Sequence, residues 1–185
     1  LSAELGKDVE KARRGAWEAA GREVNLSSPK QLQELLFDHF ALPKTKKTKT
    51  GYTTNADALA DLWAKTEASG GAGHRFLGYL LAHRDRIKLK QMVDSLIATV
   101  GADERIHTTF SQVAAATGRL ASSDPNLQNI PARSPDGMRI RGAFTPGPGY
   151  ASLMSADYSQ IEMRVMADVS GDEALIEAFA SGVDF

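Results

Sequence analysis

The sequence predicts an α+β protein, with a helical region over residues 1–100 followed by strands and helices over residues 101–185. Before Gly101, apolar residues recur at helical spacing, above all in a long amphipathic stretch over residues 75–100 that has no Gly or Pro after Gly78. After Gly101 the chain is rich in β-branched residues, Pro, Asn and Gly, which are typical of short strands and turns. A hairpin is expected there, so the strands are predicted to be antiparallel.

The composition is that of a globular protein that buries a core, with 185 residues, 42% apolar and 24% charged. The absence of cysteine excludes disulfides, a thiol nucleophile and a cysteine metal site, and is compatible with the cytoplasm. The charged first residues are not a signal peptide, and the longest apolar run, FLGYLLA, is too short to cross a bilayer, so no membrane partner is expected. Because the net charge is −1, any nucleic-acid binding must depend on local basic clusters.

Four helices are expected in the first hundred residues. The first covers residues 1–22, and the second lies in NLSSPKQLQELLFDHF, where Ser28 can cap the helix and Pro29 fits its first turn. The third begins at about Asn55, after a Lys/Thr/Gly loop, and the fourth is the stretch over residues 75–100. The aromatic residues expected in the core are Trp17, Phe37, Trp63 and Phe76.

The second part of the chain is predicted to alternate between strands and loops before it ends in helices. A hairpin is expected within ERIHTTFSQVAAATGRLAS, and SDPNLQNIPARSPDGMRIRGAF is expected to be an ordered loop with short strands. TPGPG indicates a turn, and YASLMSAD is predicted to be a strand. The helix that follows has an apolar stripe of Ile161, Val165 and Val169, and Ser170 and Glu173 have the spacing of a capping box before the next helix.

Two acids flank the junction between the predicted strand and the helix after it. Asp157 ends the strand, a rigid position suited to metal or phosphate chemistry, although a single Asp there is also typical of a turn or cap. Glu162 has the S-x-x-E spacing of a capping box with Ser159, which the pattern favours, and a ligand role is the alternative. Spacing alone does not decide between these interpretations.

Two longer segments carry a resemblance to a known family. DYSQIEMR, residues 157–164, resembles motif A of family A DNA polymerases, the bacterial DNA polymerase I type. TGRLASSDPNLQNIP, residues 117–131, is similar to the segment that precedes motif A in that family, while KTGYTTNADAL and HRDRIKLKQ resemble its thumb-tip loop and long thumb helix. The resemblance therefore covers essentially the whole chain. It implies a helical thumb subdomain over residues 1–100 and the first part of the palm subdomain over residues 101–185.

The resemblance also implies which residues of motif A do the chemistry. Asp157 matches the catalytic aspartate that bridges two Mg²⁺ ions, and Tyr158 would add its backbone carbonyl to the metal shell. Glu162 matches the side chain that fills the space of a ribose 2′-hydroxyl and so selects deoxynucleotides. Ser159, Gln160 and Ile161 match the floor of the nucleotide site. The sequence departs from the family at Asp168, where a His is usual.

Other residues are implied to hold DNA. Arg119 would contact the minor groove near the primer terminus, and Asn126, Gln128 and Asn129 would contact the backbone or template. Without the resemblance, these Asn and Gln side chains would equally well satisfy the backbone of their own loop. A basic track along the duplex would be formed by Lys44, Lys46, Lys47 and Lys49 of the thumb tip, by Thr54 and Asn55 at a helix start, and by Arg84 and Lys88.

The function implied is that of a fragment of a DNA-directed DNA polymerase in replication and repair. It would extend a primer 3′-hydroxyl by two-metal phosphoryl transfer, with a primer-template DNA duplex and deoxynucleoside triphosphates as partners. The intact enzyme is expected to be a monomer in the bacterial cytoplasm, associated with the nucleoid. The start at Leu1 suggests a piece of a longer chain.

This chain by itself is expected not to polymerise. The family's fingers helix, with the Arg and Lys that grip the triphosphate, and its second palm aspartate have no counterpart in the sequence. The alternative function is a noncatalytic duplex DNA-binding module, either a remnant or one half of a split polymerase. A hydrolase that uses Asp157 and Glu162 as an acidic pair has no other support in the sequence.

Overall fold

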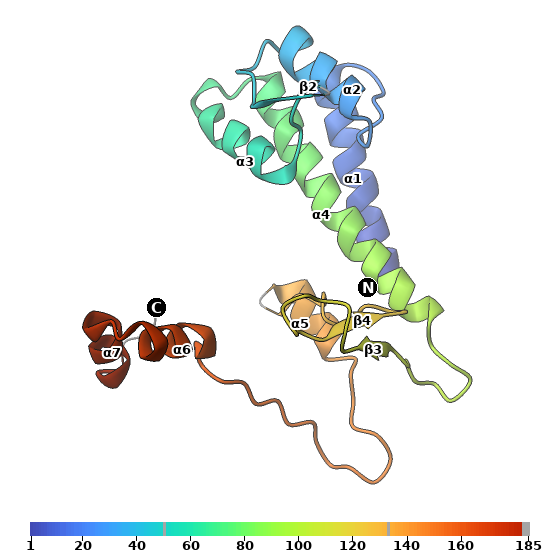
Figure 1. Ribbon diagram of the computed structural model, residues 1–185. Coiled ribbons are helices and arrows are strands. Elements are labelled where there is room, and N and C mark those ends of the chain that lie inside the picture. Colours follow the sequence, from blue (N-terminus) through green and yellow to red (C-terminus); the bar gives the residue numbers. More distant parts are fainter. Residues whose placement is uncertain (50, 133, 183–185) are drawn as a thin grey trace. The chain divides into compact units, whose positions relative to one another are not determined.

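The computed structural model describes residues 1–49, 51–132 and 134–182. The chain divides into two compact units, Leu1–Ile140 and Arg141–Phe185. Both are helix-rich, and the short antiparallel strands lie in the first, so the predicted α+β class is confirmed (Figure 1). The thumb and palm division near residue 100 remains a prediction.

Two long helices form the spine of the first unit. Helix α1 (Ser2–Ala20) packs along α4 (Ala72–Ala98), as Figure 1 shows, and α1 ends at Gly21, whose φ of 68° is left-handed. The sequence predicts both helices, although α4 begins three residues earlier than the expected residue 75. The structure therefore confirms both predicted helices.

The short helices of this unit begin where their capping residues predict. The Ser28 hydroxyl accepts a hydrogen bond from the Gln31 amide at 3.4 Å, and Pro29 opens α2 (Pro29–Gln33). The chain then continues in the wider winding of a π-helix, η1 (Glu34–His39). Asn55 caps α3 (Ala56–Lys65) through its side-chain oxygen, 3.0 Å from the Ala58 amide, and a 3₁₀ turn, η2 (Glu67–Ser69), follows.

The core of the first unit has two parts. The larger surrounds Phe76, which is 0% exposed, and draws on α1, α2, η1, α3 and α4. The smaller packs Leu5 against Ile140 together with Val93 and Leu96 near the end of α4. Phe37 is buried as predicted and Trp17 is partly buried, whereas Trp63 is 43% exposed and stacks on His74, so its predicted place in the core is wrong.

Two small hairpins belong to the same unit. Strands β1 (Lys47–Thr48) and β2 (Gly51–Tyr52) pair within the predicted Lys/Thr/Gly loop. Strands β3 (Thr109–Ser111) and β4 (Ala121–Ser123) pair antiparallel, with Phe110 opposite Ser122, and confirm the hairpin predicted after Gly101.

The ordered loop expected to contain short strands forms a helix instead. Helix α5 (Pro135–Arg141) begins after Ser134, whose hydroxyl accepts the Gly137 amide at 3.1 Å. Asp136 on α5 forms an ion pair with Arg86 on α4, and Arg139 donates to Glu4 on α1 at 2.8 Å. These contacts and the smaller core fasten α5 to both long helices.

The second unit holds α6 (Ile161–Ser170) and α7 (Glu173–Ala180), which contact each other. The strand predicted over residues 150–157 is absent, because this stretch is exposed coil and the described residues of the unit (141–182) contain no strand with which it could pair. The predicted apolar stripe of α6 is exposed, and the exposed fraction of Val169 is 81%. Within the described residues 141–182, only Ala167 is buried.

None of the helices in the described part of the chain combines the length and the apolar character that a bilayer crossing requires.

Candidate nucleic-acid and nucleotide site

The motif A residues lie at the entry to α6. Asp157 and Tyr158 are exposed in the segment before the helix, with Tyr158 at 80%. Gln160 then takes a left-handed conformation, with φ 53° and ψ 37°, and α6 begins at Ile161. The turn therefore groups the predicted metal and nucleotide residues, Asp157 to Glu162, within one short stretch of backbone.

The capping interpretation of this stretch is wrong. The N-cap of α6 is Gln160, one residue after Ser159, and it makes no side-chain capping hydrogen bond. Glu162 lies exposed in the first turn of the helix, where its negative charge suits the positive end of the helix dipole. The second predicted box fails in the same way, since Asp172 caps α7 by accepting the Leu175 amide at 3.0 Å.

Arg164 holds the turn, a role that the sequence alone does not indicate. Its Nε donates to the Ser159 carbonyl at 2.8 Å, and its guanidinium carbon lies 4.6 Å from the centroid of the Phe179 ring on α7. Arg164 stands inside the motif DYSQIEMR, but this contact depends on a fold in which α7 returns beside α6.

The donor chemistry of the turn fits a divalent metal only in part. A carboxylate and a backbone carbonyl are oxygen ligands of the kind Mg²⁺ takes, and magnesium sites use one or two carboxylates plus waters and substrate phosphates. Among the described residues, however, no group of three His, Asp or Glu side chains converges as a metal site. Asp157 is therefore an exposed carboxylate that belongs to no converging group of metal ligands within the part of the chain that the structure describes.

The predicted minor-groove residues lie on either side of β4, with Arg119 before the strand and the other three after it. Arg119 is exposed, and so are Asn126, Gln128 and Asn129. The Asn126 side-chain oxygen accepts the Gln128 amide at 3.0 Å, and the Gln128 side chain donates to the Leu120 carbonyl at 3.1 Å. Two of the four side chains thus support the loop backbone, and their contact with DNA stays a prediction.

The basic hairpin β1–β2 is fixed by residues beneath it. The Gln33 side-chain oxygen accepts the Tyr52 amide at 2.8 Å, and the Tyr52 ring meets Phe37 edge-on, with centroids 5.2 Å apart. Gly51 has a φ of 126°, and a Cβ there would lie 2.1 Å from the same Gln33 oxygen. The lysines at 44, 46, 47 and 49 are all exposed on this hairpin and its lead-in.

The residues expected to extend the basic track differ in exposure. Lys88 is exposed, as a phosphate-binding residue would be. Arg84 is only partly exposed, and its Nη1 donates to the Thr54 carbonyl at 2.5 Å. Burial also lowers the pKa of the Arg84 guanidinium. Arg84 therefore anchors the hairpin's exit, and its place in the basic track stays a prediction. Asn55 is exposed, and its side chain is already used as the cap of α3.

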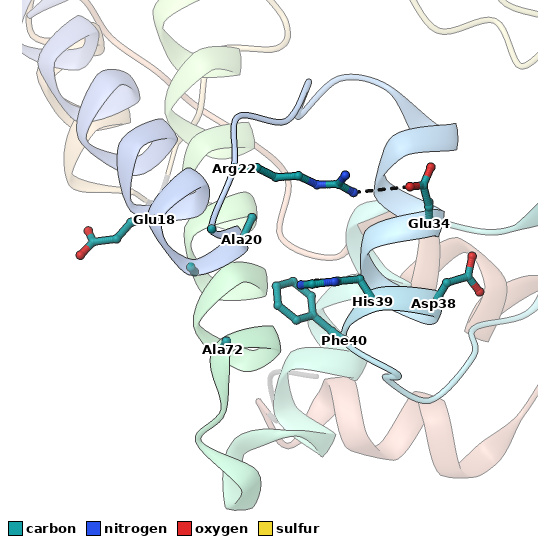
Figure 2. A pocket seen from close by; sticks show the side chains of 10 residues that line it. Glu18, Ala20, Arg22, Glu34, Asp38, His39, Phe40 and Ala72 are labelled. Atoms are coloured by element: carbon teal, nitrogen blue, oxygen red, sulfur yellow. Dashed lines mark hydrogen bonds and ion pairs between the residues drawn. The ribbon is translucent and has the colours of Figure 1, made fainter.

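An open hollow of about 860 Å³ lies elsewhere, between the end of α1, η1 and the start of α4 (Figure 2). Arg22 and Glu34 form a 3.4 Å ion pair across it. Its lining contains none of the residues predicted to bind metal, nucleotide or DNA. The predicted sites lie instead on exposed turns and hairpins.

Known proteins are similar to this chain over its whole length. The family model for DNA polymerase family A matches residues 1–185. The chain is 59% identical over 184 residues to DNA polymerase I of Mycobacterium tuberculosis (strain ATCC 25618 / H37Rv), and 43% identical over 186 residues to DNA polymerase I of Bacillus subtilis (strain 168). Each match covers 100% of this chain and 20% of the relative. The chain thus spans about a fifth of the length of these relatives.

A solved structure gives the same result. The POL domain of Pol1 from M. smegmatis, in complex with DNA primer-template and dNTP, matches with a TM-score of 0.91 and 57% identity. The match covers 99% of this chain and 31% of that one. The chain therefore belongs to DNA polymerase family A, and the resemblance predicted from its motifs is confirmed.

Proposed function

We propose that this chain is a section of a DNA-directed DNA polymerase that grips primed duplex DNA and contributes one catalytic aspartate. The observation that carries the proposal is the match over 99% of the chain to a polymerase domain that was solved with a DNA primer-template and dNTP. Residues 1–100 would be the thumb and residues 101–185 the first part of the palm. The complete enzyme would act as a monomer on nucleoid DNA in the bacterial cytoplasm.

In the proposed reaction, Asp157 and the Tyr158 backbone carbonyl would hold Mg²⁺. The bound ions would activate the primer 3′-hydroxyl and neutralise charge on the triphosphate, which is the chemistry two-metal sites supply. The chain's own task is then to hold this carboxylate and the reacting groups in line. The exposure of Asp157 supports this role, since both a metal ion and a substrate must reach it.

The turn that follows would form one side of the nucleotide site. Glu162, exposed in the first turn of α6, would occupy the space of a 2′-hydroxyl and so exclude ribonucleotides. Ser159, Gln160 and Ile161 would line the floor beside it. The closeness of these residues to Asp157 along one turn supports a shared site for metal and nucleotide.

The first unit would hold the duplex. Arg119 would donate to minor-groove acceptors, which every Watson–Crick pair presents, and so would report correct pairing without reading sequence. The exposed lysines of the hairpin would neutralise phosphates. The remaining contacts would come from Asn126, Gln128, Asn129, Thr54, Asn55 and Lys88, all of which are at least partly exposed.

A noncatalytic duplex-binding module is the second candidate function. It is favoured by the lack, among the described side chains, of a converging metal-ligand group beside Asp157. It is also favoured by the core of the first unit, which is formed from that unit's own residues. Both candidates predict that the 185-residue chain alone binds primed duplex, and the polymerase proposal adds that Asp157 works only beside ligands from the rest of the enzyme.

The test combines two assays on the purified 185-residue chain. Fluorescence anisotropy with a primed duplex should show binding that weakens as salt rises, and primer extension with Mg²⁺ and deoxynucleotides should show no product. Restoring the chain to the complete polymerase should restore extension, and the complete enzyme with Glu162→Ala should accept ribonucleotides. Extension by the chain alone would contradict the proposed division of ligands. Absence of extension by the complete protein would leave only the binding module.

A further inference from the structure

One side chain, Arg164, links the motif A turn to the helix beyond it. The Arg164 backbone amide donates to the Gln160 carbonyl at 3.0 Å, and its Nε donates to the Ser159 carbonyl at 2.8 Å. A single residue thus binds two successive carbonyls of the turn. On its other side, the guanidinium lies over the ring of Phe179, with 4.6 Å between its carbon and the ring centroid.

The turn has an uncommon backbone conformation, and its N-cap residue makes no side-chain capping bond. Gln160 is left-handed, a conformation that a residue with a Cβ adopts rarely. Helix α6 also lacks a side-chain cap, which is the usual device for fixing the entry of a helix. The bond from Arg164 to the Ser159 carbonyl therefore acts where the backbone is least favourable and where the helix start is otherwise uncapped.

The position of Ser159 in the turn explains why its bond to Arg164 bears on the proposed chemistry. Ser159 lies between Asp157, before the turn, and Glu162, in the first turn of α6. A shift of the Ser159 carbonyl would move the carboxylate and the sugar-facing side chain relative to each other. Two partners in different directions, a carbonyl and a ring face, hold the planar guanidinium in place, and a lysine could satisfy only one of them at a time.

We infer that Arg164 is a positioning residue, which sets the geometry between Asp157 and Glu162 and so affects both the rate and the sugar selectivity of nucleotide addition. Phe179 on α7 supports it by holding the guanidinium plane. This inference rests on the proposed polymerase function. It assigns no contact between Arg164 and substrate.

The experiment uses the complete polymerase that contains this chain, with single-nucleotide incorporation measured for matched deoxy- and ribonucleotides. Arg164→Lys keeps the charge and removes the Nε bond. It should lower kcat for the deoxynucleotide by roughly tenfold, since small misplacements of reacting groups reduce rates strongly. It should also lower the ratio of kcat/KM for deoxy- over ribonucleotide severalfold, with primer-template affinity unchanged. Phe179→Leu, which leaves the hydrogen bond in place, should move both quantities in the same direction by less.

Arg22→Lys is the matched control, because Arg22 pairs with Glu34 at the distant hollow and should give wild-type values. A wild-type sugar ratio in Arg164→Lys, with or without a loss of rate, would overturn the inference, because a merely structural role predicts lower yield or stability and unchanged selectivity. If Arg164→Lys does not fold, an unchanged ratio in folded Phe179→Leu would overturn it as well. The Asp157→Ala variant distinguishes a failure of the proposed function from a failure of the inference about Arg164. If Asp157→Ala still extends primers, the proposed function fails. If Asp157→Ala is inactive and Arg164→Lys behaves as wild type, only the inference about Arg164 fails.

Discussion

The two units of this chain differ in how much of their apolar surface they bury. Among the described residues, every buried apolar side chain except Ala167 belongs to the first unit, where α1 and α4 face each other and α2, η1 and α3 close over their ends. In the second unit the apolar residues of α6 and α7 stay largely exposed. A helical pattern of apolar residues therefore predicts a helix in both units. It predicts a buried core only where another apolar helix face lies in the same unit.

The two units also differ in their proposed roles, since the first would bind the duplex and the second would supply the catalytic aspartate. The proposed duplex contacts lie on hairpins fastened to a packed core, through Gln33 and Arg84 in one case. The proposed catalytic residue, Asp157, lies in exposed coil and depends on a turn held by Arg164. The proposed duplex-binding surface is therefore attached to a packed core, while the described contacts of the proposed catalytic turn are local ones.

The largest expected effect would come from opening the core of the first unit. Phe76→Ala should lower the free energy of unfolding by about 3–5 kcal/mol, because it leaves a cavity among residues that are fully buried. Val169→Ala in the second unit should change it by less than about 0.5 kcal/mol, since that side chain is exposed. Urea unfolding followed by circular dichroism measures both. Similar losses for the two variants would show that the second unit has a core of its own.

A smaller loss of stability is expected when a side chain is added at a glycine that lies close to another backbone segment. A Cβ at Gly137 would lie 2.4 Å from the Pro131 carbonyl oxygen, so Gly137→Ala should cost about 1–3 kcal/mol by displacing α5. Gly6→Ala is the matched control, because its Cβ would meet only Lys90, at an ordinary 3.4 Å, and alanine favours the helix by about 0.5–1 kcal/mol. A stable Gly137→Ala variant would mean that α5 is loosely attached. Thermal unfolding decides between these outcomes.

The proposed duplex binding should weaken when positive charge is removed from the hairpin, and should not respond to charge on the distant part of α1. Replacing Lys46 and Lys47 by alanine should reduce the slope of log affinity against log salt by roughly two, as expected for two lost phosphate contacts. The charge-matched control replaces Lys7 and Lys11, which are exposed on α1, and should leave the slope unchanged. Equal reductions in both double variants, measured by anisotropy on a primed duplex, would indicate a general charge effect and no local grip.

The smallest effect expected is a pH dependence from His83 on α4. Burial, with the nearby Arg13 and Arg84 charges, lowers the pKa of His83 below its ordinary value of 6.5, and its Nδ1 is buried with no hydrogen-bond partner among the described residues. The unfolded chain then binds more protons, so stability is full above about pH 6.5 and falls as the pH drops through the folded pKa. His83→Gln should flatten this decline between about pH 7 and pH 5. An unchanged slope in urea titrations would assign the decline to other groups.

Much of this fold follows from local signals in the sequence. Ser28 caps α2 as expected, and Asn55 caps α3, which was expected to begin at about this residue. Such signals are local, since an N-cap bond joins residues only three apart. The same Ser-Pro pair stands at Ser134 and Pro135, where it opens α5. The neighbouring Gly137 favours a turn, so this helix was missed although its signal was present. It is also stabilised by distant partners, the ion pair with Arg86 among them.

The remaining differences come from contacts that local patterns cannot reveal. Residues 150–157 form an apolar stretch that follows a turn signal, as a strand would, yet a strand needs a second strand to accept its backbone hydrogen bonds. Capping-box spacing at Ser159 and Ser170 misplaces both helix starts, because Gln160 and Asp172 occupy the N-cap positions. The candidate site was predicted through resemblance, whereas the holding contact of Arg164 on Phe179 depends on how α7 packs.

The most direct test of the account replaces Asp157 by alanine in the complete polymerase and measures primer extension and duplex binding side by side. The division of labour between the units predicts that extension falls by at least roughly a thousandfold, equivalent to about 4 kcal/mol of transition-state stabilisation. Affinity for the primed duplex, which the first unit supplies, should stay at the wild-type value. Extension within a few fold of wild type, or a parallel loss of duplex binding, would contradict the account.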